Sequence, residues 1–293
     1  MNRRSEKSNR SLSIEILTRL SQIFNSKSWE IENDNPEQPS LFNRYCSLLS
    51  DLTESEQSLI LELTERFTRI SSNQYSYHIK QIVDQLAQDP RFNLAQISNI
   101  FIAPLISPED LKLGKVKSSL MVQYAFPEQL AYNMYFSNKN ISFVTGLNAD
   151  SSNINNDSSL LLVVDDFIGS GDTACSALNY LLHDKKISRD KMIVASIVAL
   201  NQGITKISEL GVQVVSSLTF FKGISEHYSL EDRVGKLTLM DEIERKIKVH
   251  ENEKLGYGQS EALVSMIRTP NNTFPVFWKE KKGRVAPFPR KNF

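Results

Sequence analysis

Residues 160–173 read LLLVVDDFIGSGDT, and this stretch decides the fold. Five apolar residues lead into Asp165 and Asp166, and two more lead into a loop of small residues at 169–173. An unbroken run rich in Leu and Val is typical of a strand buried on both faces of a parallel sheet. The segment ACSALNYLL at 174–182 predicts a helix after the loop. The order of strand, loop and helix indicates an α/β protein.

The loop at 169–173 is suited to binding an anion. Backbone N–H groups are unpaired at the start of a helix, and the helix dipole favours negative charge there. The hydroxyls of Ser170 and Thr173 can donate hydrogen bonds to phosphate oxygens. Asp165 and Asp166 would repel a phosphate, but carboxylates accept hydrogen bonds from the hydroxyls of a ribose. The ligand predicted from these residues is therefore a ribose 5-phosphate unit.

Residues 165–173 resemble the phosphoribosyl pyrophosphate (PRPP) loop of type I phosphoribosyltransferases. In that family a buried strand ends in two acids, two apolar residues and a Thr-Gly-any-Thr loop. The resemblance implies a parallel-sheet phosphoribosyltransferase-like core, in which Asp165 and Asp166 are the catalytic residues that hold the ribose hydroxyls. It also implies that Mg²⁺ accompanies PRPP. The residues implied to bind the 5-phosphate are Gly169, Ser170, Gly171, Asp172 and Thr173.

Two positions depart from the family's pattern. Gly169 stands where some purine-specific members carry an acid that acts as a base toward the nucleobase. Asp172 fills the free position of the loop. We expect its charge to point outward, because a carboxylate close to the phosphate would weaken phosphate binding.

The resemblance gives two further segments a role. In type I phosphoribosyltransferases the loop after the first core strand holds pyrophosphate, and here that strand is expected at 100–106. The residues implied to bind there are Lys115, Lys117, Ser118 and Ser119. Lys222, after a strand expected at 212–221, matches the place where some members contact the base. The alternative for these lysines is an ordinary solvated surface.

A second family offers a competing interpretation of the same loop. DDFIGSGDT is close to the DPFxGSGTT loop by which DNA amino-methyltransferases hold S-adenosylmethionine. Those enzymes also need an Asn/Asp-Pro-Pro-aromatic motif, but the chain has no Pro-Pro dipeptide, and Asp166 replaces the Pro of the loop. A P-loop is excluded because no Lys follows the glycines. A dinucleotide-binding loop lacks its third Gly here, and the acids precede the loop instead of following it.

Composition and charge set the broad class. The chain has 293 residues and a formal net charge of zero, which gives no global field toward nucleic acid or membrane. No apolar run approaches the length of a membrane span, and the first residues lack the apolar core of a signal peptide. Cys46 and Cys175 have no metal-ligand spacing and fit a reducing cytoplasm. We therefore expect a cytoplasmic protein without a membrane partner.

Hydrophobic spacing predicts two regions, an N-terminal helical region at 1–92 and an α/β domain at 93–293. The helices expected in the first region lie near 12–24, 43–52, 53–70 and 77–86. The further strands expected in the second lie near 141–147 and 192–200. A polar run at 150–159 predicts a turn or insert. Beyond the last strand we expect a long helix at 230–254, ended by Gly256, and a second helix at 260–266.

The C-terminal tail carries a more specific resemblance. The segment TPNNT at 269–273, the following Phe-Trp pair and a terminal FPR resemble a branch of phosphoribosyltransferase-like proteins of bacterial conflict systems, including retron loci. This resemblance implies a toxic effector of antiviral defence, with a reverse transcriptase and its RNA–DNA hybrid as partners. The alternative is a nucleotide-sensing module without turnover. The aromatic residues of the tail must cover either the edge of the core or a ligand's base. The basic residues that would meet nucleic acid are Lys279, Lys281, Lys282, Arg284, Arg290 and Lys291.

Overall fold

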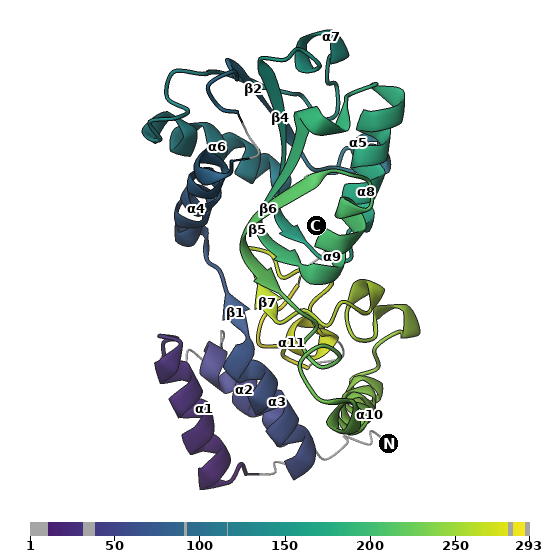
Figure 1. Cartoon of the computed structure of the whole chain (residues 1–293). Helices are drawn as coiled ribbons and strands as arrows, with labels where there is room; N and C mark the ends of the chain where they lie inside the picture. The colour runs from purple at the N-terminus through teal and green to yellow at the C-terminus, as the bar shows by residue number, and fades with distance from the viewer. Residues whose placement is uncertain (1–10, 32–38, 91–92, 116, 281–283, 291–293) are drawn as a thin grey trace. The chain divides into compact units, whose positions relative to one another are not determined.

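A computed structural model describes residues 11–31, 39–90, 93–115, 117–280 and 284–290 (Figure 1). The chain divides into two compact units. Unit 1 combines Met1–Arg69 with Lys222–Phe293, and unit 2 is Ile70–Phe221. This division differs from the boundary expected at residue 92. The fourth expected helix belongs to unit 2, and the C-terminal tail belongs with the first three helices.

Unit 2 is built on a five-stranded parallel sheet with the strand order β3-β2-β4-β5-β6. The α/β fold class predicted from the sequence is confirmed. The strands are β2 (Asn99–Pro104), β3 (Asn140–Phe143), β4 (Ser159–Ile168), β5 (Met192–Leu200) and β6 (Gln213–Phe220). From β2 the chain moves to β3 on one side and then crosses to β4 on the other. The sheet therefore has its topological switch point between β2 and β4, where open α/β sheets bind ligands at the carboxyl ends of their strands.

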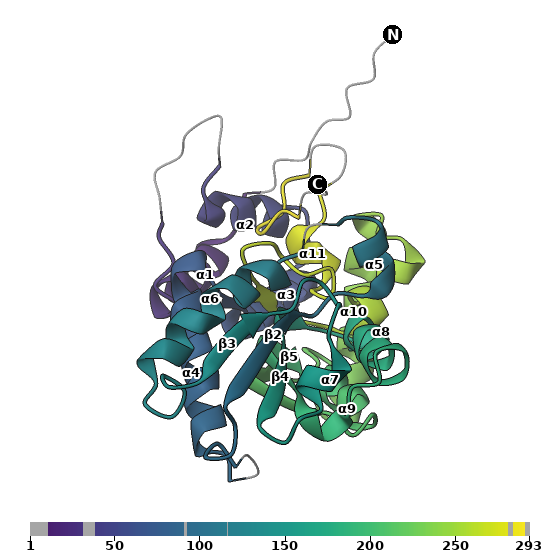
Figure 2. The same cartoon turned by 90° about the horizontal axis from the view of Figure 1, so that it is seen from above.

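Helices cover both faces of this sheet. Figures 1 and 2 show α4 (Tyr75–Gln88) and α6 (Ser119–Tyr132) on one face, and α8 (Asp172–Asn179) and α9 (Asn201–Ser208) on the other. Because side chains of a strand alternate between faces, Leu161 and Val163 of β4 pack with Ala177 and Leu178 of α8. Two short helices, α5 (Pro108–Lys112) and α7 (Ser151–Ile154), follow β2 and β3. Helix α7 lies in the polar run for which we expected a turn or insert.

Unit 1 contains helices from both ends of the chain. They are α1 (Ile14–Ser26), α2 (Leu41–Ser50), α3 (Glu54–Arg66), α10 (Leu230–Lys246) and α11 (Pro275–Trp278). A capping box starts α3, with Glu56 accepting from the Thr53 backbone N–H at 2.8 Å. A two-stranded parallel sheet pairs β1 (Thr68–Arg69) with β7 (Val264–Ser265).

Two expectations for the C-terminal part are wrong. The long helix ends at Lys246, well before Gly256, because Lys248 takes a left-handed conformation with φ 57°. The Val249 N–H then bonds the Glu244 carbonyl at 2.9 Å and closes a helix-ending motif that usually carries Gly or Asn. The segment expected as a helix at 260–266 contains β7 instead, since a short apolar run does not distinguish helix from strand.

The aromatic residues of the tail lie in the core of unit 1. Phe277 and Phe288 are buried, and both pack against Phe67 at the end of α3, with ring centroids 4.8 and 4.6 Å away. Phe288 also meets the ring of Trp29 edge-on at 5.7 Å. Of the two alternatives, the core therefore accounts for these rings. Their burial stabilises the packing of the N-terminal helices against the tail.

The described members of the basic cluster have internal partners. Lys279 forms an ion pair with Glu253, and Arg290 donates to the Thr269 carbonyl. Arg284 donates to the carbonyls of Val276 and Lys279, and burial lowers its pKa to about 10. These three cations therefore support the fold of the tail. Lys281, Lys282 and Lys291 lie outside the described residues. Within the described ranges no helix is long and apolar enough to cross a membrane.

The buried carboxyl group of Glu244 in α10 should make the stability of the fold depend on pH. Its side chain is 0% exposed, and this burial raises its pKa to about 8, although the Leu255 N–H donates to it at 3.0 Å. The folded state therefore keeps a proton that the unfolded chain releases above about pH 4.3. The contribution of Glu244 to stability should therefore be lost as the pH rises from about 4 to 8.

Glu244→Gln should remove this loss while keeping an oxygen that accepts from Leu255. We expect it to raise the free energy of unfolding at pH 8 by about 1–3 kcal/mol and to change it little at pH 4. Denaturant unfolding at both pH values measures the difference. The exposed Glu242 on the same helix is the matched control as Glu242→Gln. A gain of the same size at both pH values would contradict the assignment.

Candidate functional site

The two acids of β4 lie at the topological switch point of the sheet. Register with β2 ends where Pro104 pairs with Val164, whereas β4 continues beside β5 to the pair of Ile168 with Ala199. Asp165 and Asp166 are therefore the first residues of β4 beyond the end of β2. This is the position that the sequence predicts for a ligand site of an α/β sheet.

Asp166 joins three elements of unit 2. Its side chain is 5% exposed. The Tyr75 hydroxyl, at the start of α4, donates to Oδ2 at 2.9 Å. The Ser118 hydroxyl, just before α6, donates to Oδ1 at 2.6 Å. Both carboxylate oxygens thus accept a hydrogen bond from the protein. Tyr75 was not predicted from the sequence, because nothing local marks a contact over 91 residues.

Asp165 has a different environment. Its side chain is half-buried, and Oδ1 accepts from the backbone N–H of Asp166 at 2.9 Å. Burial, followed by the charge of the Asp166 carboxylate, raises the pKa of Asp165 well above its usual range. A cation, or ribose hydroxyls that donate hydrogen bonds, would favour the charged form of this group.

The loop after β4 has the geometry of a strand-to-helix turn. Gly171 takes φ 84° directly before α8, a conformation that favours glycine. The Ser170 hydroxyl donates to Oδ2 of Asp172 at 2.9 Å, and Lys206 of α9 forms an ion pair with Oδ1 of the same carboxylate. Asp172 is half-exposed and is neutralised by a partner, whereas we expected only an outward-pointing charge. Thr173 is exposed.

Gly203 of α9 supports this loop. A Cβ at this position would lie 2.5 Å from the Gly169 carbonyl oxygen and 2.8 Å from Cγ2 of Ile168. Helix α9 can therefore pack against the loop only because residue 203 is glycine. Gly203 and Lys206 were both missed from the sequence, although the three-residue spacing on a helix places them on the same face.

The predicted pyrophosphate segment is brought to the same edge of the sheet. Lys115 and Lys117 both form ion pairs with Asp110 of α5, at 2.7 and 2.6 Å. Ser118 bonds Asp166, which links this segment to the acid pair. Ser119 is buried in the first turn of α6, and its hydroxyl oxygen lacks a hydrogen-bond partner among the described residues.

Lys222 is the one predicted site residue that does not belong to unit 2. It belongs to unit 1, whereas the acid pair and both loops belong to unit 2. Its backbone N–H donates to the Glu226 carboxylate at 2.7 Å. The geometry of unit 2 therefore brings together all the predicted site segments except Lys222.

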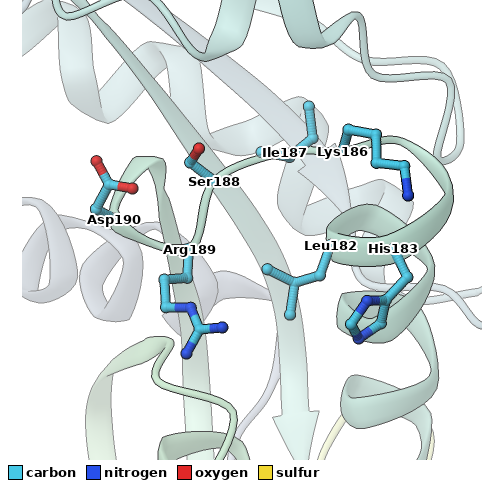
Figure 3. Close-up of a pocket in the computed structure, with 7 residues that line it drawn as sticks. All are labelled: Leu182, His183, Lys186, Ile187, Ser188, Arg189 and Asp190. Carbon is cyan, nitrogen blue, oxygen red and sulfur yellow. The ribbon is translucent and has the colours of Figure 1, made fainter.

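A cavity of about 390 Å³ lies elsewhere in unit 2 (Figure 3). Its lining residues are Leu182, His183, Lys186, Ile187, Ser188, Arg189 and Asp190. These residues directly precede β5, so the cavity lies toward the amino end of that strand. It includes none of the predicted site residues.

Asp165 and Asp166 can hold Mg²⁺ only if oxygen atoms of a bound ligand complete its coordination. Over the described residues, no group of three or more His, Cys, Asp or Glu side chains is arranged to hold a metal. Asp165 and Asp166 are adjacent carboxylates, and Mg²⁺ is often held by one or two carboxylates plus the phosphates of a substrate. The residues are thus suited to an ion that arrives with a phosphorylated ligand.

Comparison with known proteins identifies the family to which the chain belongs. Residues 42–290 match the PRTase-CE family. The chain belongs to this family. PRTase-CE membership covers most of the chain and supports the predicted type I phosphoribosyltransferase-like character. It also favours that interpretation of the loop over the methyltransferase.

Two solved structures that are similar to this PRTase-CE protein have low sequence identity to it. Orotate phosphoribosyltransferase from Aeropyrum pernix is 16% identical, with a TM-score of 0.32, over 57% of this chain and 77% of that one. The AQ2163 protein from Aquifex aeolicus is 11% identical, with a TM-score of 0.32, over 65% of this chain and 87% of that one. No curated protein matches the chain.

Proposed function

We propose that this PRTase-CE protein binds PRPP, or a related ribose phosphate, and transfers its phosphoribosyl group. The observation that carries the proposal is the position of Asp165 and Asp166 at the switch point, followed by the loop at 169–173. Family membership supports the same class of reaction.

Each segment of the site has a role in this proposal. Asp165 and Asp166 accept hydrogen bonds from the ribose hydroxyls, and the loop at 169–173 binds the 5-phosphate. The pyrophosphate contacts the segment that carries Lys115, Lys117, Ser118 and Ser119. Mg²⁺, held by Asp165 and Asp166 together with ligand oxygens, would neutralise negative charge on the pyrophosphate.

The chemistry proposed for these residues is mainly positioning. Breaking the bond between the anomeric carbon and pyrophosphate leaves positive charge on the ribose ring. Asp165 and Asp166 fix the ring through its hydroxyls, and their negative charge stabilises the charge that develops there. The lysines of the second loop stabilise the negative charge of the leaving pyrophosphate.

We further propose a biological setting, that of a toxic effector in a retron-type antiviral defence system of the cytoplasm. The tail segment TPNNT and the terminal FPR support it through the resemblance described above. A reverse transcriptase and its RNA–DNA hybrid are the proposed partners. A reverse transcriptase gene beside this one would support the setting, and a neighbourhood of purine-synthesis genes would count against it.

A second candidate is a nucleotide-sensing module without turnover. Gly169 favours it, because some transferases of this type carry a base at that position. Both oxygens of Asp166 already accept hydrogen bonds from the protein, which also suits a binding role.

Titration calorimetry of the purified protein with Mg²⁺ and PRPP tests the proposal. We expect saturable binding of PRPP and none of S-adenosylmethionine. Release of pyrophosphate in the presence of a panel of nucleobases and nucleotides would support the transferase, whereas binding without release would support the sensor. Binding of S-adenosylmethionine in place of PRPP would overturn both and favour the methyltransferase.

A further inference from the structure

The phosphate-binding groups of the proposed site are held by carboxylates of the protein itself. In the loop after β4, the Ser170 hydroxyl and the Lys206 ammonium group both bind Asp172. A hydroxyl and a cation are the donors that a phosphate would use at a helix start. The Asp172 carboxylate therefore presents to this loop the same kind of charged oxygens that a phosphate would present.

The second loop repeats this arrangement. Lys115 and Lys117 both bind Asp110, whose side chain is 14% exposed. Burial alone would raise the pKa of Asp110, but the hydrogen bonds from the two lysines outweigh it and lower the pKa to about 2. The carboxylate is therefore charged at neutral pH and stays paired with both lysines.

We propose that Asp172 and Asp110 act as internal competitors for the phosphate and pyrophosphate of the ligand, and that Lys206 is a further phosphate-binding residue. This inference rests on the proposed function, since it concerns the same site. When the ligand binds, Lys206 leaves Asp172, and Lys115 and Lys117 leave Asp110. The three lysines then bind phosphate oxygens of the ligand instead. The affinity of the free protein for each anionic group is thereby lowered. Only a ligand that carries a phosphate and a pyrophosphate displaces both Asp172 and Asp110.

The arrangement is more specific than ordinary capping of a helix. An acid in the first turn of α8 would interact favourably with the helix dipole without any partner on another helix. Lys206, however, reaches Asp172 from α9, whose close approach to the loop depends on Gly203. The cation is thus held beside the loop by the packing of α9, where it remains available to a phosphate once Asp172 is displaced.

Removing the competing charges should strengthen anion binding. The probes are inorganic pyrophosphate and ribose 5-phosphate, titrated into the full chain. We expect Asp110→Asn to tighten pyrophosphate binding about tenfold, because two charge-assisted contacts no longer have to be broken. Asp172→Asn should tighten ribose 5-phosphate binding about threefold, a smaller effect because its ion pair is half-exposed. Lys206→Met should weaken ribose 5-phosphate binding, because it leaves Asp172 charged and unpaired beside the ligand.

Asp84→Asn is the matched control. Asp84 of α4 pairs with Lys80 at 2.5 Å, so this change alters the net charge of unit 2 equally without touching either loop. Equal gains in this control and in the two loop variants would overturn the inference, as would wild-type affinities in Asp110→Asn and Asp172→Asn. Melting curves identify any variant that fails to fold, and Asp110→Ser then replaces Asp110→Asn.

The proposed function and this inference fail in different ways. Wild-type binding of PRPP with no gain in the variants would overturn the competition and leave the proposed function standing. Binding of pyrophosphate only by the variants would support the competition, and absence of binding by every protein would overturn both.

Discussion

Asp165→Asn is expected to abolish most PRPP binding while making the fold more stable. The charged carboxylate is proposed to hold a ribose hydroxyl, and a hydrogen bond to a charged group contributes about 1.5–3 kcal/mol. Its replacement by an amide should therefore weaken PRPP binding about ten- to a hundredfold. Calorimetric titration of PRPP with Mg²⁺ into wild type and variant measures this loss.

The gain in stability follows from the raised pKa of Asp165. A carboxyl whose folded pKa is raised stabilises the fold at low pH and loses that contribution as the pH rises above its unfolded value. Asn carries no such pH dependence, and its amide oxygen can still accept from the Asp166 N–H. The melting temperature of the variant should therefore exceed that of wild type at pH 7, and the difference should shrink toward pH 4.

Asp166→Asn is the matched comparison. It should lose PRPP binding as well, but it should lower the melting temperature, since both carboxylate oxygens accept a hydroxyl in the wild type. Replacing one oxygen by an NH₂ group forces Tyr75 or Ser118 to reorient. Equal shifts in both variants would contradict the different environments described for the two acids. Wild-type affinity for PRPP in Asp165→Asn would contradict its role in binding.

Gly256→Ala is expected to have the largest effect on stability in unit 1. Gly256 adopts φ 78° and ψ 161°, a conformation that is essentially restricted to glycine. A Cβ there would lie 2.0 Å from the carbonyl oxygen of Asn272, so the TPNNT segment would have to move. That segment is fixed by a bond from the Tyr257 N–H to the Asn271 carbonyl at 2.8 Å. We expect a loss of about 3–5 kcal/mol, at the upper end of single substitutions.

Gly235→Ala provides the control for this change. Gly235 lies within α10 of the same unit, and no atom lies within 4 Å of a Cβ built there. Alanine is favoured over glycine in a helix, so this variant should gain about 0.5–1 kcal/mol. Denaturant unfolding of both variants measures the two opposite signs. A loss below about 1 kcal/mol in Gly256→Ala would show that the 269–273 turn adapts to the added methyl group.

Local patterns were enough to predict the central part of unit 2. The apolar runs that form β4 and β5 are long, bounded by polar residues and rich in Leu, Val and Ile, so length and composition agree. The loop after β4 was recognised because its residues are consecutive in sequence. The predicted position of Asp165 and Asp166, at the carboxyl end of a parallel strand, follows from the same local reasoning.

The missed features depend on contacts between distant segments. Tyr75 meets Asp166 only after α4 has packed against the sheet. The glycine at 203 has no local turn to form and is explained only by the approach of Gly169. Likewise Gly256 suggested the end of a helix, whereas its real constraint is Asn272 of the tail. In each case a tertiary contact, not a residue preference, decides the conformation.

The interrupted course of unit 1 along the chain has a consequence for its synthesis. Met1–Arg69 leaves the ribosome before Ile70–Phe221, and its packing partners in Lys222–Phe293 emerge last. The rings of Trp29, Tyr45 and Phe67 must therefore wait for Phe277 and Phe288 before they are covered. Unit 2 is contiguous and can fold as its own residues appear. Until Phe277 and Phe288 have emerged, the nascent chain carries an exposed aromatic surface, so chaperone capture and proteolysis of incomplete chains should concentrate on α1–α3.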